Sequence, residues 1–371
     1  MSRKWYSPRS LAVSSLDFAG RTLPSNLWKR TLARRLDLPF SLSVASTDEC
    51  NLACVHCVRE VYPEEPVRKL KHMPFDTFRR LSDVFPYVLT VGLEDRGEPL
   101  MNPEIFRMVR HVKQVSNGTT EVQFNSNMML LTREKAEELV DSGLDALQIS
   151  LDGGTAEAFE RIRIKGDFEK VVENSRMLQE VKRLKGSATP HLSMNVVAMR
   201  SNVETLPEVA RIAASIGVES LGVNGVQPHT LRMRDEPLYH RDGPNAPREE
   251  HARFFQEAAR IAGNAGIAFI PARMTPDPGL ICQVALNSAS ITWDGYVHPC
   301  TFLAHDADIY NFGEKSHWPS LHFGNIQEQS LSEIWRSPRY VAFRKAIAAG
   351  KLPDYCEGCL VRQGCICHGI G

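Results

Sequence analysis

Strand-like and helix-like segments alternate along most of this chain, and this alternation restricts the possible folds more than any other feature. Short runs of apolar residues recur between segments whose apolar residues have helical spacing. The strand-like runs cover residues 40–46, 87–93, 121–125, 146–151, 191–198 and 220–224. The helical patterns between them cover residues 103–115, 133–141, 168–183 and 203–214. Repeated strand–helix units predict a parallel sheet with helices outside it.

The number of these units predicts an α/β fold of the partial barrel type, a (β/α)6 TIM-like barrel rather than a closed eight-stranded one. Glycines support the repeat, because Gly143, Gly217 and Gly266 each follow a helical pattern directly before an apolar run. Glycine is the favoured residue just past a helix end. In such folds the chemistry lies at the carboxyl ends of the strands, so we expect functional residues directly after each strand.

The pattern changes after the sixth unit, and this change predicts a second domain. Residues 228–248 are polar and predict a long loop, and residues 249–264 predict a helix. Beyond them come a hairpin-like run at 289–297, a helical pattern at 331–349 and a cysteine-rich tail. We predict an N-terminal extension at 1–39, the partial barrel at 40–275 and a small cysteine-rich α+β domain at 276–371.

The N-terminal extension contains one amphipathic pattern, at residues 25–38. It sets Leu27, Trp28, Leu32 and Leu36 against Lys29, Arg30, Arg34 and Arg35. A helix of this kind can lie on a membrane surface, but we expect it to pack against the domain instead.

Composition excludes several classes of partner. The chain of 371 residues carries 44 Lys and Arg against 44 Asp and Glu, so its charge gives no reason to expect nucleic acid as a partner. Residues 1–20 lack the apolar core of a secretory signal, and no apolar run is long enough to span a bilayer. We expect a cytoplasmic protein with no membrane partner.

Nine cysteines gather toward the two ends of the chain. They are Cys50, Cys54, Cys57, Cys282, Cys300, Cys356, Cys359, Cys365 and Cys367. An odd number of cysteines without a secretory signal argues against a disulfide framework, and the short spacings indicate metal sites.

Cys50, Cys54 and Cys57 form a CxxxCxxC motif directly after the first strand. Three thiolates on one tight loop can hold three irons of a [4Fe–4S] cube. The fourth iron is then open to a small molecule, and open metal positions are typical of catalytic sites. A zinc site made by these cysteines and His56 is the alternative, although zinc sites usually take paired ligands from two loops.

This motif resembles the hallmark of the radical S-adenosylmethionine (SAM) superfamily, and the resemblance covers roughly residues 40–230. Arg96-Gly97-Glu98-Pro99 resembles the family's GGEP motif, with Arg96 in place of the first Gly. The resemblance implies that its backbone meets the SAM amino group. It also implies SAM contacts near the methionine for Asn125 and Ser126, near the ribose for Ser150 and Asp152, and weaker ones for Asn195 and Asn202.

In that family a reduced cluster cleaves SAM to methionine and a 5′-deoxyadenosyl radical, which takes a hydrogen atom from the substrate. The resemblance therefore implies a [4Fe–4S] cofactor, SAM, and an electron donor of the flavodoxin or ferredoxin type.

The C-terminal cysteines resemble the SPASM and twitch extensions of radical SAM enzymes, which carry auxiliary [4Fe–4S] clusters. The pattern is Cys-x-x-Cys-x5-Cys from Cys356 to Cys365, with Gly295 five residues before Cys300. A zinc ribbon is the structural alternative. Six cysteines allow one cluster with four thiolates, or two clusters that use an open iron or His298 or His368 as a ligand.

Several reactions suit an enzyme of this type. We expect oxidation of a small alcohol or sugar-type substrate, because only 49 residues precede Cys50 and they lack a peptide-clamping pattern. Epimerisation is less favoured, since it needs a spare thiol and every cysteine lies in a cluster motif. A spare thiol exists only if Cys365 or Cys367 binds no cluster. Oxidation or crosslinking of a ribosomally made peptide is the alternative, and a non-enzymatic metal-binding protein is the least favoured reading.

The loop after the sixth strand supplies further candidates for a base or a substrate anchor, although each of them also suits a solvated loop. They are His229, Arg232, Arg234, Asp235, Glu236 and His240.

Overall fold

The computed structural model of the protein describes residues 23–61 and 72–365. Among these residues, nine strands form one sheet in the order β11-β10-β1-β3-β4-β5-β7-β8-β9. The predicted barrel strands are β1 (Ser41–Val44), β3 (Thr90–Gly92), β4 (Glu121–Ser126), β5 (Ala146–Ser150), β7 (His191–Ala198) and β8 (Ser220–Gly225). All six pair in parallel with their neighbours, which confirms the partial α/β barrel.

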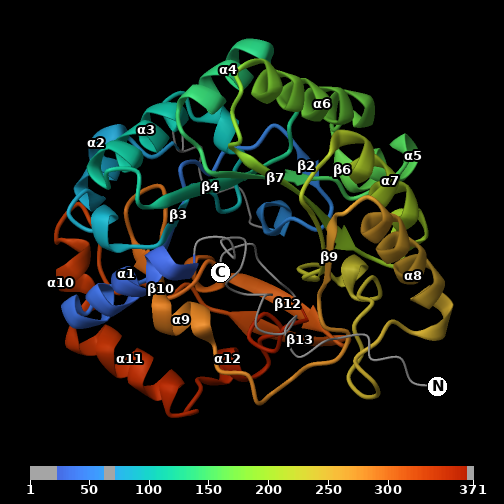
Figure 1. Cartoon of the computed structure of the whole chain (residues 1–371). Helices are drawn as coiled ribbons and strands as arrows, with labels where there is room; N and C mark the ends of the chain where they lie inside the picture. The colour runs from blue at the N-terminus through green and yellow to red at the C-terminus, as the bar shows by residue number, and fades with distance from the viewer. Residues whose placement is uncertain (1–22, 62–71, 366–371) are drawn as a thin grey trace.

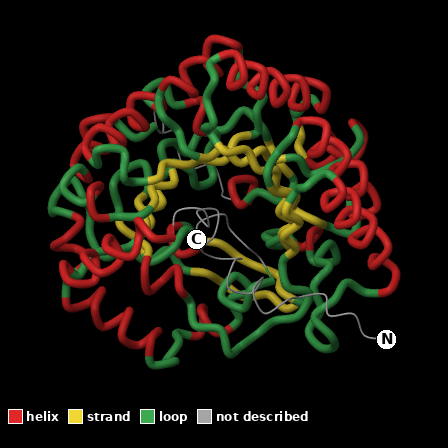
Figure 2. The backbone as a smooth tube through the Cα atoms, in the orientation of Figure 1, coloured by secondary structure: helices red, strands yellow, loops and turns green. Residues whose placement is uncertain are grey.

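Helices cover the outside of this curved sheet, as Figure 1 and Figure 2 show. They are α3 (Ile105–Val115), α4 (Arg133–Asp141), α5 (Ala156–Ile162), α6 (Phe168–Leu184), α7 (Leu206–Ile216) and α8 (Glu249–Asn264). The apolar stripe of α3 buries Ile105, Met108, Val109 and Val112 against the sheet. Gly217 caps α7 with a φ of 77°, a backbone conformation that residues with a side chain rarely adopt.

A seventh parallel strand, β9 (Ala268–Pro271), follows Gly266 and pairs with β8. At the opposite edge, β10 (Ser288–Ile291) pairs in parallel with β1, and β11 (Val297–His298) pairs antiparallel with β10. The predicted hairpin at 289–297 therefore exists, and it extends the barrel sheet. The domain boundary near residue 275 stays a prediction, because strands on both sides of it belong to one sheet.

The rest of the C-terminal region consists of short elements. The hairpin of β12 (Ala307–Asn311) and β13 (Glu314–Trp318) lies between the two ends of the curved sheet in the view of Figure 1. The remaining helices here are α9 (Gln283–Asn287), α10 (Leu331–Trp335), α11 (Pro338–Ala348) and α12 (Asp354–Glu357), with the 3-10 turn η7 (Phe302–Ala304).

The prediction of one continuous helix at residues 331–349 is wrong. The structure divides it into α10 and α11, because Ser337 caps α11 by accepting from the Tyr340 amide and Pro338 occupies its first turn. A proline at this position cannot continue a preceding helix, since it lacks the amide hydrogen and clashes with the turn before it.

The N-terminal helix α1 (Leu23–Leu36) confirms the amphipathic element but corrects its polar face. Lys29 is 1% exposed, and its ammonium donates to the carbonyls of Val88 (3.0 Å) and Thr119 (2.7 Å) and to the Thr120 hydroxyl (2.9 Å). Leu36, expected on the apolar face, is exposed. The helix packs against the domain, at the amino ends of β3 and β4.

Smaller elements complete the described chain. They are the strands β2 (Ala53–Cys54) and β6 (Arg163–Ile164), the helix α2 (Phe75–Phe78), and the 3-10 turns η1 (Val58–Val61), η2 (Arg79–Leu81), η3 (Phe85–Tyr87), η4 (Pro99–Met101), η5 (Val203–Thr205) and η6 (Leu231–Met233). No helix in the described ranges is long and apolar enough to cross a membrane.

Candidate active site

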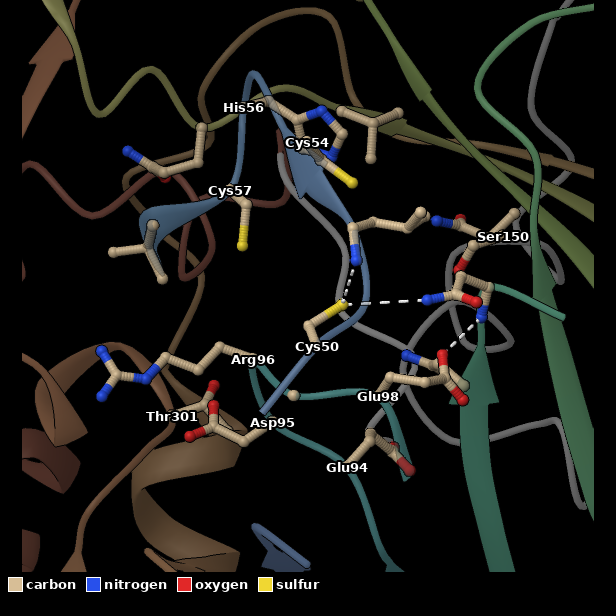
Figure 3. A pocket seen from close by; sticks show the side chains of 18 of the residues that line it. Cys50, Cys54, His56, Cys57, Glu94, Asp95, Arg96, Glu98, Ser150 and Thr301 are labelled. Carbon is tan, nitrogen blue, oxygen red and sulfur yellow. Dashed lines mark hydrogen bonds between the residues drawn. The ribbon is translucent and has the colours of Figure 1, made fainter. Parts of the chain in front are cut away.

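The CxxxCxxC segment leaves β1 and forms a loop that is fastened at its centre. Strand β2 within it pairs with β6, so that Cys54 lies opposite Arg163. The Val55 amide also donates to the Ile162 carbonyl at 2.9 Å. A loop held by a distant segment of the barrel presents its thiols in a fixed arrangement, and Figure 3 shows the three sulfur atoms around a common space.

Buried polar groups surround these thiols. The Cys50 sulfur accepts from the Leu52 amide at 3.5 Å and from the Asn127 side chain at 3.8 Å. Burial raises the pKa of the Cys54 thiol to about 12, against the opposing charge of Arg163. Iron must displace the protons of such thiols when it binds, so metal loading and deprotonation are linked.

Arg163 is a site residue that the sequence did not reveal. Its guanidinium lies 2.8 Å from the Asp152 carboxylate and 4.0 Å from the Cys54 sulfur, and its side chain is 9% exposed. Although burial works against it, the Asp152 charge raises the pKa of Arg163 above its ordinary value. A permanent cation therefore stands beside the thiols, where it favours the thiolates that bind iron.

Asp152 has a different immediate role from the one the resemblance implies. Its carboxylate is fully buried, pairs with Arg163, accepts from the Val197 amide at 2.8 Å and lies 3.6 Å from the His56 imidazole. Asp152 does not line the cavity beside the thiols, whereas Ser150, two residues earlier, does. The SAM contact of Asp152 stays a prediction.

The Arg96-Gly97-Glu98 segment packs directly against the start of the cluster loop. A Cβ at Gly97 would collide with the Thr47 carbonyl, so only glycine fits this close approach. Arg96, the departure from the family pattern, forms a bidentate ion pair with Asp48 of the cluster loop, with its second nitrogen at 2.8 Å. The substitution is accommodated because it adds a connection between the two loops.

Glu98 fixes the relative position of three segments. Its amide donates to the Glu49 carbonyl at 2.7 Å. Its carboxylate accepts from the Leu100 amide at 3.1 Å, the Ser126 hydroxyl at 2.9 Å and the Asn127 amide at 2.7 Å. Pro99, also predicted to contact SAM, begins the turn η4 and is not among the residues that line the main cavity.

The thiols and most of the predicted SAM contacts line one cavity of about 300 Å³. Its walls contain Cys50, Cys54, Cys57, Gly97, Glu98, Asn125, Ser126, Ser150 and Asn195. Asn195 is oriented by Asn224, whose amide donates to its side-chain oxygen at 2.7 Å. Asn202 instead donates to the Asp152 and Val197 carbonyls and holds the backbone behind the cavity.

The polar loop after β8 contributes little to this cavity. Of its six candidates only His229 lines the wall. Glu236 accepts from the Ser201 amide and hydroxyl, and His240 contacts the carbonyl oxygens of Asp242 and Ala246. These two residues shape the loop, which agrees with the structural reading of them.

The C-terminal region closes the cavity. Thr301, Phe302, His305, Ala307 and Trp318 form part of its wall. His305 lies 2.7 Å from Asp95, which follows β3. Although burial opposes the shift, the His305 ring lowers the pKa of Asp95 below its ordinary value. The cavity is thus completed by residues on both sides of the predicted domain boundary.

Four of the remaining cysteines converge on a second, smaller cavity of about 30 Å³, lined by Cys282, Cys300, Cys356 and Cys359. Burial first, and then the charges of Cys359 and Cys282, raise the pKa of Cys356 to about 12. Cys365 does not line this cavity and packs with Tyr239 and Leu360, while Cys367 lies outside the described residues. This arrangement fits one cluster held by four thiolates.

In the described part of the chain, no three His, Cys, Asp or Glu side chains are placed to hold a single metal ion. The fit of iron–sulfur clusters therefore rests on the two cavities that the thiols share and on the preference of such clusters for thiolate ligands.

Comparison with known proteins agrees with both cysteine sites. Residues 44–213 match the radical SAM superfamily, and residues 282–360 match SPASM, an iron–sulfur cluster-binding domain. The chain is 28% identical over 327 residues to the tungsten-containing aldehyde ferredoxin oxidoreductase cofactor-modifying protein of Pyrococcus furiosus, covering 86% of each chain. It is 27% identical over 344 residues to the PqqA peptide cyclase of Gluconobacter oxydans, covering 90% of this chain and 87% of the cyclase.

Among solved structures, the fold is similar to that of Streptococcus suis SuiB bound to S-adenosylmethionine. The TM-score is 0.60 at 15% identity, over 91% of this chain and 76% of SuiB. SuiB bound to its precursor peptide SuiA gives 0.59, over 89% of this chain and 73% of SuiB. The chain therefore belongs to the radical SAM superfamily: it is an enzyme that uses a [4Fe–4S] cluster with SAM, and its C-terminal SPASM domain carries one or two auxiliary [4Fe–4S] clusters.

Proposed function

We propose that this enzyme is a peptide maturase, which oxidises or crosslinks a ribosomally made peptide. The main support is the match to a PqqA peptide cyclase over nearly the whole of both chains. The fold similarity to SuiB, a protein known in complex with a precursor peptide, is compatible with this function. These relatives favour peptide modification over the oxidation of a small alcohol expected from the short N-terminal extension.

The shape of the site also supports a long substrate. A third cavity, of about 420 Å³, adjoins the main one. It is lined by Leu231, Asp306, Asp308 and His317, and it shares His229 and Ala307 with the main cavity. An extended chain can occupy both spaces at once, with one residue at the reacting centre and its neighbours at the surface.

The proposal assigns each set of residues a task. Cys50, Cys54 and Cys57 hold the cluster that works with SAM, and Cys282, Cys300, Cys356 and Cys359 hold an auxiliary cluster. When bound, these groups supply single-electron chemistry, one for the cleavage of SAM and the other for the electron that leaves the substrate. Gly97, Glu98, Asn125, Ser126, Ser150 and Asn195 bind and orient SAM. A flavodoxin- or ferredoxin-type protein supplies the electron.

The wall between the two sites is thin. Phe302 and Trp318 line both cavities, and their rings meet edge to face with centroids 5.0 Å apart. These two side chains therefore offer an electron that leaves a substrate in the main cavity a short path to the four-cysteine site. This proximity supports a net oxidation, in which the substrate loses a hydrogen atom, a proton and an electron.

A test is to incubate the anaerobically reconstituted enzyme with SAM, dithionite and synthetic peptides encoded beside its gene. We expect 5′-deoxyadenosine to form together with a peptide that has lost two hydrogen atoms, both measured by mass spectrometry. Deuterium carried from a labelled peptide into 5′-deoxyadenosine identifies the reacting residue. If none of the peptides changes in mass or transfers deuterium, the proposal is wrong.

A small-molecule substrate remains the second candidate because of one specific observation. The relative with 28% identity, from Pyrococcus furiosus, is named as a protein that modifies a cofactor. In that case deuterium would reach 5′-deoxyadenosine from a labelled small molecule and from none of the peptides.

A further inference from the structure

One acidic side chain in the main cavity has no role in the assignments above. Glu94 follows β3 at its carboxyl end, lines the cavity and is only 5% exposed. Both of its carboxylate oxygens are buried, and no side chain that the structure describes donates a hydrogen bond to either of them. A buried carboxyl group without a side-chain partner is costly, and this cost points to a partner from outside the protein.

The fold makes room for this carboxyl group. A Cβ on Gly92, two residues earlier on the same side of the strand, would lie 2.9 Å from the Glu94 Oε1 atom. Gly92 therefore provides the space in which the carboxyl group rests. The Glu94 backbone is held as well, because the Ser43 hydroxyl donates to its carbonyl at 3.1 Å.

The two described arginines of the cavity wall and His305 are already committed to other carboxylates. Arg96 pairs with Asp48, Arg163 pairs with Asp152, and His305 pairs with Asp95. Among the residues that the structure describes, no lysine lines the wall. Burial raises the pKa of Glu94 to about 8, against a smaller opposing effect of the Asn125 amide. The group thus lacks a positive partner in the described protein and ionises readily only when one arrives.

SAM does not satisfy this need in our assignment. SAM is a cation, but the cluster beside it, with three thiolates, carries a net negative charge of its own. Glu98, the other unpaired acid in the wall, already accepts three hydrogen bonds. When the cluster and SAM are both bound, Glu94 is therefore the acidic group of the described wall that still lacks a positive partner.

We propose that Glu94 forms a subsite for a cationic group of the substrate, an ammonium or guanidinium such as the side chain of a lysine or arginine residue. The identity of the group as part of a peptide rests on the proposed function, whereas the charge preference rests on Glu94 alone. The carboxylate binds the cation by charge-assisted hydrogen bonds in a site with little water, which is where such bonds are strongest.

The test uses N-acetyl-lysine amide and its uncharged analogue N-acetyl-norleucine amide as probes. Binding of each to the SAM-loaded, cluster-reconstituted enzyme is measured by calorimetry, for the wild type, for Glu94→Gln and for the surface control Glu138→Gln. We expect the wild type and the control to prefer the lysine probe by about tenfold to a hundredfold, and Glu94→Gln to lose that preference.

A second variant keeps the carboxyl group but displaces it. Gly92→Ala places a methyl group 2.9 Å from the present position of Oε1, so the carboxyl group must shift. We expect this shift to weaken the preference for lysine in protein that retains its iron and its circular dichroism spectrum. This variant decides the question if Glu94→Gln fails to fold.

Three results overturn the inference. The first is an unchanged preference for lysine in folded Glu94→Gln or Gly92→Ala, and the second is the lack of any preference in the wild type. The third is a loss of SAM affinity in Glu94→Gln as large as the loss of lysine affinity, which would assign Glu94 to the SAM site. Neither readout requires that a peptide be modified, so the inference can fail or hold independently of the maturase proposal.

Discussion

At the scale of single residues, the site depends on buried charges that are neutralised in pairs. Asp152 and Arg163 stand behind the thiols, Asp48 and Arg96 join the two loops in front of them, and Asp95 meets His305. Removing one member of such a pair destabilises a protein more than replacing both members with apolar residues, because the remaining partner is left as an uncompensated buried charge. Glu94 departs from this rule, and for that reason we assign it a ligand.

Replacing Cys54 with Ala is expected to abolish the formation of 5′-deoxyadenosine while the protein still folds. The residue lies opposite Arg163 in the pair of β2 and β6, and an alanine keeps that backbone pairing. Without Cys54 the cluster keeps only two of its three protein ligands. The measurement is 5′-deoxyadenosine by chromatography after reduction with dithionite. Cys365→Ala, which alters a cysteine outside both cavities, is the matched control, and cleavage by Cys54→Ala at the rate of this control would contradict the prediction.

At the scale of elements, the irregular connections determine the site more than the regular strands do. The pairing of β2 with β6 fixes the cluster loop, and the loops after β3 and β4 are joined through Glu98. Helix α1 packs at the opposite end of the barrel, where the Lys29 ammonium donates to backbone carbonyls that precede β3 and β4. A lysine in this position fastens the helix as a polar anchor.

Lys29→Met is expected to destabilise the protein by about 1–3 kcal/mol, because the Val88 and Thr119 carbonyls lose their buried donor. Burial lowers the pKa of Lys29 to about 8, so the unfolded chain binds an additional proton between that pH and the ordinary pKa of lysine. The advantage of the wild type over the variant should therefore grow as the pH rises from about 7 to about 9.

The measurement is the thermal unfolding midpoint of the reconstituted protein across that pH range. Arg35→Met, on an exposed position of the same helix, is the control. An effect no larger than that of Arg35→Met, or an advantage that shrinks with rising pH, would show that Lys29 does not anchor the helix.

At the scale of the whole molecule, the C-terminal region takes part in the barrel as well as binding its own cluster. It supplies β10 and β11 to the sheet, a wall of the main cavity and the four cysteines of the smaller one. The main cavity and the four-cysteine cavity therefore meet at Phe302 and Trp318.

Replacing both Cys356 and Cys359 with Ala is expected to lower the iron content by about four atoms per chain. We expect the variant to keep reductive cleavage of SAM and to lose product formation, because the cluster loop is intact and the electron acceptor is absent. Iron analysis, 5′-deoxyadenosine and product are measured together, with circular dichroism as the check on folding, since cluster binding contributes to the stability of a small domain. Full product formation by a folded variant would make the auxiliary cluster structural and favour a redox-neutral reaction.

The sequence by itself determined the features that depend on local spacing. The order of strands and helices predicts the parallel sheet, the CxxxCxxC motif predicts an open cluster, and Gly97 and Glu98 are recognisable because their segment resembles the family's GGEP motif. These patterns can be read from the chain because a turn of helix, a strand and a tight loop are all made by residues close in sequence.

Only the tertiary structure decided what distant residues do together. It brings Cys282 and Cys300 to Cys356 and Cys359 and leaves Cys365 apart. It also sets Arg163 beside Cys54 and buries Lys29 on a face that the helical pattern marked as polar. The physical reason is that partners far apart in the chain are chosen by packing, and the charge, burial and ligands of a side chain depend on those partners rather than on its neighbours in sequence.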